Sequence, residues 1–531
     1  MAHPWWKGAT IYQIYPRSFF DADNDGVGDL PGATAKLDHI AALGVDGVWL
    51  SPFFASPMRD FGYDVADYRA VDPVFGRLED FDALVARAHE LGLKVVIDQV
   101  YSHTSDRHAW FQESRADAGS RKADWYVWAD AKPDGTPPNN WLSVFGGPAW
   151  SWCTRRRKYY LHNFLSEQPD LNFHNPDVQD AILDVARFWL DRGVDGFRLD
   201  VANYYFHDAA LRDNPPSGTA PHPRPYAYQR HEHNRSQPEN IKFLKRLRGV
   251  LDEYDDRMSV AEIFSSAHIA RSAEYTEGED RLHTAYNFLM LEASTLTADL
   301  VRDALEGWRG VDAWPSWSFS NHDVKRVLSR WAGPEGGPAE AAQMLALLLA
   351  LRGTVFLYQG EELGLPQADV AFEDLRDPEA IRFWPDNLGR DGCRTPMPWT
   401  RAAPNAGFST GAPWLPVDPR HAELAVDAQA NDPGSTLSLA RRLLKLRRDR
   451  HALRLGDVAF LDVEPPLVAF ERRSADDAIV CGFNLSDAER ALPAAAAKRI
   501  GAIHDLGLNA RREGDAIVLP PRGAFFADPA P

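Results

Sequence analysis

Amphipathic helical patterns alternate with short apolar runs along the chain. Within residues 178–192, Val178, Ile182, Val185 and Trp189 fall on one face of a helix. A glycine follows each such pattern, and glycine readily takes the left-handed conformation that ends a helix. The clearest units are residues 35–43, Gly44 and 47–50; residues 81–91, Gly92 and 94–97; and residues 178–192, Gly193 and 196–199.

The apolar runs predict buried strands of a parallel sheet. They are short and continuous, as expected where both faces of a strand are covered. Their alternation with helices favours a parallel arrangement. Eight such strands are predicted at residues 11–15, 47–50, 94–97, 196–199, 259–264, 285–289, 317–319 and 355–358.

Eight strands that alternate with helices predict a (β/α)8 TIM barrel. The strands extend from residue 11 to residue 358, whereas a plain barrel needs only about 250 residues, so insertions between the strands are expected. The alternative is a doubly wound sheet. That fold typically carries a crevice motif such as G-x-G-x-x-G after a strand, and the chain has none.

Two segments break the repeating pattern. Residues 104–172 are rich in Trp, Pro, Gly and Asn without helical periodicity, which indicates a loop-rich subdomain inserted after the third strand. Short strand-like runs at 458–461, 467–470 and 478–480 indicate a small antiparallel β domain. The expected parts are the first part of the barrel (1–103), an inserted subdomain B (104–173), the second part of the barrel (174–455) and a C-terminal β-sandwich domain (456–531).

Composition and charge indicate a globular protein and disfavour nucleic-acid binding. The 531 residues are 44% hydrophobic and 25% charged, as in ordinary globular proteins, and the net charge of -18 disfavours nucleic acid as a partner. The run Arg155-Arg156-Arg157-Lys158 is the local exception, a solvated loop or an anion site.

The cysteines and apolar runs favour a cytoplasmic protein. Cys153, Cys393 and Cys481 are odd in number and far apart, so no disulfide framework or zinc spacing is present. The chain begins without an apolar leader, and its longest apolar run, 344–351, is too short to span a membrane. The sequence does not determine an oligomeric state.

Acidic and basic residues gather where the predicted strands end. In a barrel, functional groups stand at the carboxyl ends of the strands. A single acidic residue there is commonly a cap or an ion-pair partner, but a converging set is not explained in that way. The set comprises Asp98 and His103 after the third strand, Arg198 and Asp200 after the fourth, Glu262 in the fifth, and Asn321, His322 and Asp323 after the seventh.

Paired carboxylates suit glycoside hydrolysis, which uses one as nucleophile and the other as acid and base. Arg198 lies two residues before Asp200 on the same strand face, so it favours an ionised nucleophile. Glu262 follows an apolar strand, where desolvation raises the pKa of a general acid. Asp323 is a candidate for holding sugar hydroxyls. The chain has no P-loop and no G-x-S-x-G motif.

These motifs resemble those of glycoside hydrolase family 13, the α-amylase family, and specifically its α-glucosidase and oligo-1,6-glucosidase branch. They occur in the family's order and cover essentially the whole chain. Ser102 departs from the pattern, because the family usually has Asn before the His. The segments are DQVYSH (98–103), QPDLN (168–172), GFRLD (196–200), AEIF (261–264) and SNHD (320–323).

The resemblance implies roles for individual residues. Asp200 corresponds to the nucleophile, Glu262 to the acid/base and Asp323 to the transition-state stabiliser, and no cofactor is needed for catalysis. Tyr63 corresponds to a stacking platform under the sugar. Residues implied to bind the glucose hydroxyls or orient the carboxylates are His103, Arg198 and His322.

Further residues are expected to shape the pocket. The resemblance implies that Asp60 and Arg394 pair at the non-reducing end of the glucose, unless they form only a structural bridge. Phe145 and Phe164 are expected to wall the pocket, with core packing as the alternative. Val201 follows the nucleophile, where the branch associates Val with α-1,6 acceptance; strand packing is the alternative.

Residues 21–29 place carboxylates at alternate positions around a glycine, as in the first half of a calcium-binding loop. The Glu of a full EF-hand is missing, since position 32 is Gly32. The resemblance implies structural Ca²⁺ or Mg²⁺ at this loop, with a metal-free turn as the alternative. The implied ligands are Asp21, Asp23, Asp25, the Val27 carbonyl and Asp29.

The expected protein is therefore a retaining, exo-acting α-glucosidase that releases α-glucose from short α-glucosides such as maltose, isomaltose or sucrose. One alternative is a transglucosylase or sucrose-isomerising enzyme, because an acceptor can replace water at a covalent intermediate. The other is a non-catalytic, transporter-associated barrel, which the three retained carboxylates disfavour.

Overall fold

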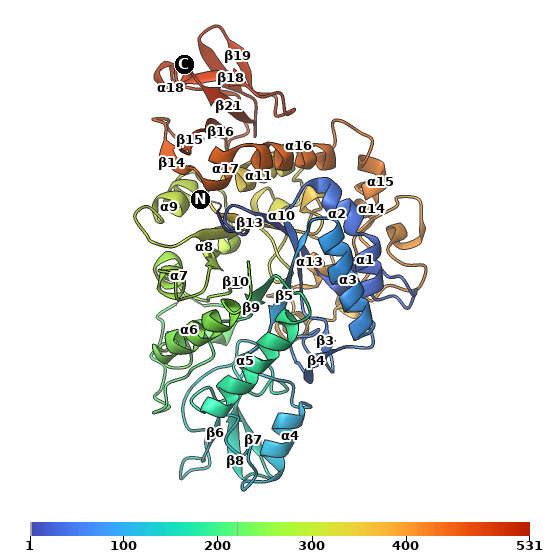
Figure 1. The fold of residues 1–531 in the computed structure, drawn as a ribbon, viewed down its shortest axis with the longest axis vertical. Coiled ribbons are helices and arrows are strands. Elements are labelled where there is room, and N and C mark those ends of the chain that lie inside the picture. Colours follow the sequence, from blue (N-terminus) through green and yellow to red (C-terminus); the bar gives the residue numbers. More distant parts are fainter. Residues whose placement is uncertain (1–2, 220) are drawn as a thin grey trace.

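Eight parallel strands form a closed barrel in the computed structural model, which describes residues 3–219 and 221–531 (Figure 1). Their order around the barrel is β1-β13-β12-β11-β10-β9-β5-β2. The predicted barrel is confirmed, and each predicted strand overlaps one barrel strand. The strands are β1 (Thr10–Ile14), β2 (Gly47–Leu50), β5 (Lys94–Gln99), β9 (Gly196–Leu199), β10 (Met258–Ala261), β11 (Thr284–Tyr286), β12 (Pro315–Ser318) and β13 (Thr354–Tyr358).

The predicted strand at residues 285–289 is too long. β11 ends at Tyr286, and α8 (Phe288–Glu292) begins two residues later. Asn287 causes the change, because its side chain accepts a hydrogen bond from the backbone N–H of Leu289 at 3.0 Å and so caps the helix.

Helices pack around the outside of the barrel. α5 (Pro176–Leu190) begins two residues before the predicted helix, because Asn175 caps it and Pro176 suits the first turn. The predicted helix 35–43 is two short helices that meet at Lys36. The two short helices are α1 (Leu30–Ala35) and α2 (Leu37–Leu43). The larger helices are α3 (Leu78–Glu90), α6 (Glu239–Leu251), α7 (His268–Thr276), α9 (Ala298–Glu306), α11 (Pro338–Ala350) and α16 (Thr436–Asp449).

The three predicted glycines are all left-handed, and Gly44 and Gly92 lie at the helix ends as predicted. Gly44, Gly92 and Gly193 have φ values of 88°, 75° and 89°. α5 ends at Leu190, two residues before the predicted end, so Gly193 lies in the turn that follows its C-cap Asp191. None of the helices in the described residues is both long and apolar enough to cross a bilayer.

The loop-rich segment between β5 and α5 holds a small sheet and a helix. The sheet has the order β6-β8-β7 and is antiparallel, and Trp141, Trp150 and Leu161 belong to its apolar core. Helix α4 (Ala109–Ala116) was not predicted; it has only eight residues, too few for a clear period. The strands are β6 (Trp128–Ala129), β7 (Trp150–Cys153) and β8 (Lys158–Leu161).

The C-terminal part forms antiparallel sheets, as predicted, at the end of the molecule opposite β6–β8 (Figure 1). The larger sheet has the order β14-β15-β16-β21-β18, and the smaller one β17-β20-β19. Arg472 joins the larger sheet to the barrel, because its buried guanidinium donates to the carbonyls of Ala350, at the end of α11, and Gly456. The strands are β14 (Asp457–Phe460), β15 (Leu467–Arg473), β16 (Ala478–Asn484), β17 (Arg490–Ala491), β18 (Ile500–Ile503), β19 (Arg511–Glu513), β20 (Ala516–Leu519) and β21 (Ala524–Pro529).

Candidate active site

One guanidinium contacts three carboxylates at the carboxyl ends of β5, β9 and β10. Arg198, which is fully buried, donates through Nη1 to Asp98 at 2.8 Å and to Asp200 at 2.7 Å. Its Nη2 lies 2.8 Å from Oε2 of Glu262. We call these four residues the Arg198 cluster. Parallel strands bring their carboxyl ends to one rim, so residues far apart in sequence meet here.

The Arg198 cluster has more acids than its single arginine can neutralise. Burial raises the pKa of Asp98 to about 6 and also raises the pKa values of Asp200 and Glu262, while the charge of Arg198 opposes the rise. Carboxyl groups coupled in this way titrate as a unit. The cluster is therefore suited to hold a proton next to an ionised carboxylate, which acid-assisted nucleophilic displacement requires.

Asp323, after β12, has a different electrostatic environment. Arg394 Nη2 donates to it at 2.7 Å, and Arg390 Nη1 lies 3.4 Å away. Burial alone would raise the pKa of Asp323, but His322, Arg394 and Arg390 outweigh burial and hold the pKa well below its usual range. Asp323 is therefore an ionised group beside the Arg198 cluster.

The predicted Asp60–Arg394 pair is wrong. Asp60 pairs with Arg390, whose Nη2 donates to it at 2.8 Å, while Arg394 binds Asp323 and the carbonyl of His322. The two arginines are about one helical turn apart at α13 (Asp391–Arg394), so the turn decides which of them reaches Asp60. Arg390 also donates to Asp377 at 2.8 Å. We call Arg390, Arg394, Asp60, Asp323 and Asp377 the arginine-pair cluster.

A cavity of about 450 Å³ opens beside both clusters. Arg198, His322 and Arg394, which are fully buried, stand behind residues that face this space. The residues predicted for the site that line it are Asp60, Tyr63, His103, Phe145, Phe164, Asp200, Val201, Glu262 and Asp323.

Tyr63 links the two sides of the cavity floor. Its ring stacks on that of His322 with an interplanar angle of 8°, and its hydroxyl donates to Asp98 at 3.1 Å. Burial lowers the pKa of His322 to about 3, so this imidazole is neutral at pH 7. The stacked ring of His322 and the hydrogen bond to Asp98 thus hold the ring of Tyr63 in place beside the cavity, as a platform for an apolar sugar face requires.

The aromatic wall comes from the inserted segment. Phe164 lies 5.2 Å from the ring of His103 and 6.2 Å from that of Phe145. The guanidinium of Arg390 lies 5.2 Å from the centre of the Phe145 ring. An apolar wall beside a polar floor is typical of a small-ligand site.

Several cavity residues had not been predicted. Gln168, within the quoted QPDLN segment, contacts Asp60 at 3.3 Å and His103 at 3.2 Å. Arg224 forms an ion pair with Glu379 among the cavity-lining residues. The QPDLN motif could have identified Gln168 as a site residue. No sequence motif indicates the pairing of Arg224 with Glu379, because that pairing depends on long loops.

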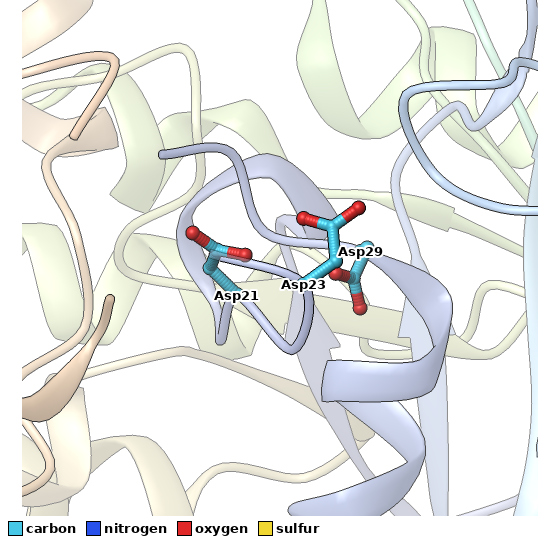
Figure 2. Close-up of side chains that lie close together, drawn as sticks. All are labelled: Asp21, Asp23 and Asp29. Atoms are coloured by element: carbon cyan, nitrogen blue, oxygen red, sulfur yellow. The ribbon is translucent and has the colours of Figure 1, made fainter. Parts of the chain in front are cut away.

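The loop before α1 gathers three of the predicted metal ligands. One carboxylate oxygen each from Asp21, Asp23 and Asp29 lies within 4.8 Å of the others (Figure 2). Asp25 lies outside this cluster, and its Oδ1 accepts the N–H of Val27 at 2.8 Å. The all-oxygen donor set fits Ca²⁺ or Mg²⁺.

Comparisons with known proteins agree with this geometry. The family model for the alpha-amylase catalytic domain matches residues 13–456. A Rhizobium meliloti protein named "Probable alpha-glucosidase" is 52% identical over 98% of this chain and 97% of its own length. An oligo-1,6-glucosidase of Heyndrickxia coagulans is 39% identical over 91% and 92%.

Solved structures share the whole fold. The crystal structure of an alpha-glucosyl transfer enzyme superimposes with a TM-score of 0.94 at 53% identity, covering 99% of both chains. The trehalulose synthase of Pseudomonas mesoacidophila MX-45 gives a TM-score of 0.90 at 31% identity, covering 100% of both. The chain therefore belongs to the α-amylase family of glycoside hydrolases, family 13.

Proposed function

We propose that this protein is a retaining, exo-acting α-glucosidase of short α-glucosides. The observation that carries the proposal is the Arg198 cluster, in which Asp200 and Glu262 contact different nitrogens of one guanidinium beside the cavity. Two carboxyl groups held near each other suit the double displacement of a retaining enzyme.

In the first step a carboxylate oxygen of Asp200 attacks C1 of glucose as the C1–O glycosidic bond breaks. Glu262 gives its proton to the departing oxygen, and a β-glucosyl ester forms on Asp200. In the second step Glu262 takes a proton from water, whose oxygen attacks C1 and releases α-glucose with Asp200 as carboxylate. Asp323, which is ionised, is positioned to accept hydrogen bonds from sugar hydroxyls and stabilise positive charge at C1.

The pair of Asp60 with Arg390 supports exo action. Both groups are buried and line the cavity, and Arg390 lies against Phe145, so a charged, hydrogen-bonding wall stands where a longer chain would have to continue. Terminal glucose hydroxyls match such a wall, and large starch chains should be poor substrates. Val201 also lines the cavity, and we propose broad linkage acceptance there.

We further propose that Asp21, Asp23 and Asp29 hold a structural Ca²⁺ or Mg²⁺. Among the described residues these three carboxylates have no ion pair, although their oxygens lie within 4.8 Å of one another. A divalent cation would supply the missing positive charge and fix the loop after β1. Asp25, whose carboxylate lies outside this group, and the Val27 carbonyl are the further ligands that we propose.

A second candidate function is glucosyl transfer. It is favoured by the titles of two similar structures, an alpha-glucosyl transfer enzyme and a trehalulose synthase. A glucosyl-enzyme reacts with any hydroxyl that reaches C1, so the outcome depends on whether water or an acceptor occupies the cavity mouth.

Time-resolved analysis of the anomer released from maltose, isomaltose and sucrose tests the proposal, with Asp200→Asn as the inactive control. The glucose that leaves from the reducing end of maltose or isomaltose carries both anomers, so the anomer is read with sucrose, whose leaving group is fructose. We expect α-glucose from sucrose with the wild type, and the relative rates on the three sugars define linkage preference. Release of β-glucose from sucrose would contradict a retaining mechanism. Release of fructose at high sucrose concentration with new disaccharides in place of free glucose would establish the transferase.

A further inference from the structure

The hydrogen-bond ladder between β9 and β10 slips by one residue directly after Asp200. Ala261 is in register with Leu199, and the N–H of Glu262 donates to the Leu199 carbonyl at 3.0 Å. In a regular parallel ladder, the N–H of Val201 would donate to the Glu262 carbonyl. Here the N–H of Ala202 makes that bond, at 2.8 Å. Val201 is therefore the extra residue of a bulge.

The bulge gives Val201 an unusual backbone conformation. Its φ is +36°, in the left-handed region, where a β-branched residue is a true outlier. Backbone strain of this kind persists where the surrounding structure fixes it and is concentrated at functional sites. The consequence at Val201 is that its N–H leaves the ladder and donates to Oε2 of the Glu262 side chain, at 3.1 Å.

Oε2 of Glu262 thus has one hydrogen-bond donor, the N–H of Val201, and one ion-pair partner. Arg198 Nη2 lies 2.8 Å from the same oxygen but is not directed at it as a hydrogen-bond donor. Among the described residues, the nitrogen contacts of this carboxyl group shorter than 3.5 Å both fall on Oε2, and the neighbouring Asp200 carboxyl group is also within hydrogen-bonding range of it. Donors stabilise the unprotonated oxygen of a carboxylic acid, so the proton is directed to Oε1.

We propose that Val201 is a positioning residue for the general acid: its bulged backbone commits Oε2 of Glu262 to protein donors and so fixes the transferable proton on Oε1. The inference rests on the proposed role of Glu262 in glycoside cleavage. Other charged or titratable groups around Glu262 are Asp98 and Arg198 from β5 and β9, Asp200 after β9, Tyr286 from β11 and Asp323 after β12. None of them replaces a directional N–H on Oε2.

The direct test removes this one N–H. In the full-length enzyme, Val201 is replaced by its α-hydroxy acid, which turns the amide into an ester and keeps the side chain. kcat/KM is measured for maltose, whose leaving group needs a proton, and for α-glucosyl fluoride, whose leaving group does not. We expect the maltose-to-fluoride ratio of kcat/KM to fall about tenfold, the scale of one hydrogen bond to a charged group. The basic limb of the maltose pH profile should also move to higher pH. The N–H favours the ionised form of Glu262, so its removal raises the pKa of this group.

Two matched variants separate the N–H from other effects. The same ester change at Ala202 removes a ladder bond to the Glu262 carbonyl instead, and should leave the ratio unchanged. Val201→Gly keeps the N–H, and glycine accepts positive φ, so the basic limb of its maltose pH profile should stay at the wild-type position, whatever the loss of the side chain does to leaving-group binding. An unchanged ratio in the Val201 ester, an equal fall in the Ala202 ester, or an equal shift of the basic limb in Val201→Gly would overturn the proposal.

A second measurement does not depend on variant folding. Neutron diffraction of the wild type, at a pH below the basic limb, should locate the deuteron of Glu262 on Oε1; a deuteron on Oε2 would overturn the proposal. A wild type that hydrolyses neither maltose nor the fluoride would refute the proposed function itself, which is a different result.

Discussion

The Arg198 cluster and the arginine-pair cluster lie on the same cavity and differ in charge balance. Each holds three carboxylates, but the first has one arginine and the second has two. Burial therefore raises the pKa values of Asp98, Asp200 and Glu262. In the second cluster the arginines outweigh burial and lower those of Asp323 and Asp377.

This difference in charge indicates that the two clusters have different roles. The cluster with one arginine for three acids holds a proton that can be transferred, whereas the cluster with two arginines keeps its acids ionised and offers a fixed pattern of charge to a substrate. The acids of residues 21–29 are a third case, since among the described residues they have no arginine or lysine partner. This is where we expect a metal ion. The predictions below test this comparison, from the largest effect to the smallest.

Removing the nucleophile should have the largest effect. Asp200→Ala should lower kcat/KM for maltose by roughly 10⁴-fold or more, because no covalent intermediate can form. Added azide should restore turnover and give β-glucosyl azide, since the small anion attacks from the vacated side. Comparable activity without azide, or an α-azide product, would contradict the assignment of Asp200.

Removing the acid should have a smaller effect that depends on the leaving group. Glu262→Ala should lower kcat/KM for maltose by about 10² to 10⁴-fold, the usual contribution of general acid catalysis. α-Glucosyl fluoride should lose much less. Azide should now give α-glucosyl azide, because it intercepts the glucosyl-enzyme. Equal losses for both substrates would remove Glu262 from proton transfer.

Removing the metal should lower stability but not change the chemistry. Chelation should reduce the free energy of unfolding by about 3 kcal/mol if the ion is normally present at roughly 100 times its Kd. Metal analysis and denaturant unfolding measure this loss. Asp21→Asn should reproduce it, whereas Asp25→Asn, outside the carboxylate cluster, should cost less. Unchanged metal content and stability after chelation would contradict the proposal that a divalent cation neutralises these carboxylates.

The arginine-pair cluster should make stability depend on pH in a defined window. Arg390 holds the pKa of Asp377 at about 2 against the effect of burial, below the unfolded value near 4. This group therefore stabilises the fold above pH 4 and loses its contribution as pH falls toward 2. Relative to Asp377→Asn, the wild type should lose about 2 kcal/mol between pH 5 and pH 2.

The raised pKa of Asp98 gives a contrast of opposite sign. Its folded pKa of about 6 exceeds the unfolded value, so its contribution is present below pH 4 and is lost as pH rises through 6. Relative to Asp98→Asn, the wild type should lose stability from pH 4 to pH 6. If the stability difference between wild type and variant changed with pH in the same direction for Asp98→Asn and Asp377→Asn, the proposed difference in charge balance between the clusters would be contradicted.

The sequence predicted what depends on local pattern. Apolar runs located all eight barrel strands, and the acids that follow them were predicted to meet because parallel strands end at one rim. Predictions from the sequence failed where long loops determine which side chains meet. Arg390 and Arg394 both belong to the segment after β13, and only the folded turn shows that Arg390 reaches Asp60. The bulge at Val201 gave no signal, because β-branched residues rarely adopt positive φ.

The most direct test of the central claim is to trap the covalent intermediate. The wild-type enzyme is incubated with 5-fluoro-α-D-glucosyl fluoride, digested and analysed by mass spectrometry. We predict one fluoroglucosyl group per chain, on the peptide that contains Asp200, and its loss when maltose is added as acceptor. A label on another carboxylate, or hydrolysis of maltose by an enzyme that never accumulates a label, would contradict double displacement through Asp200.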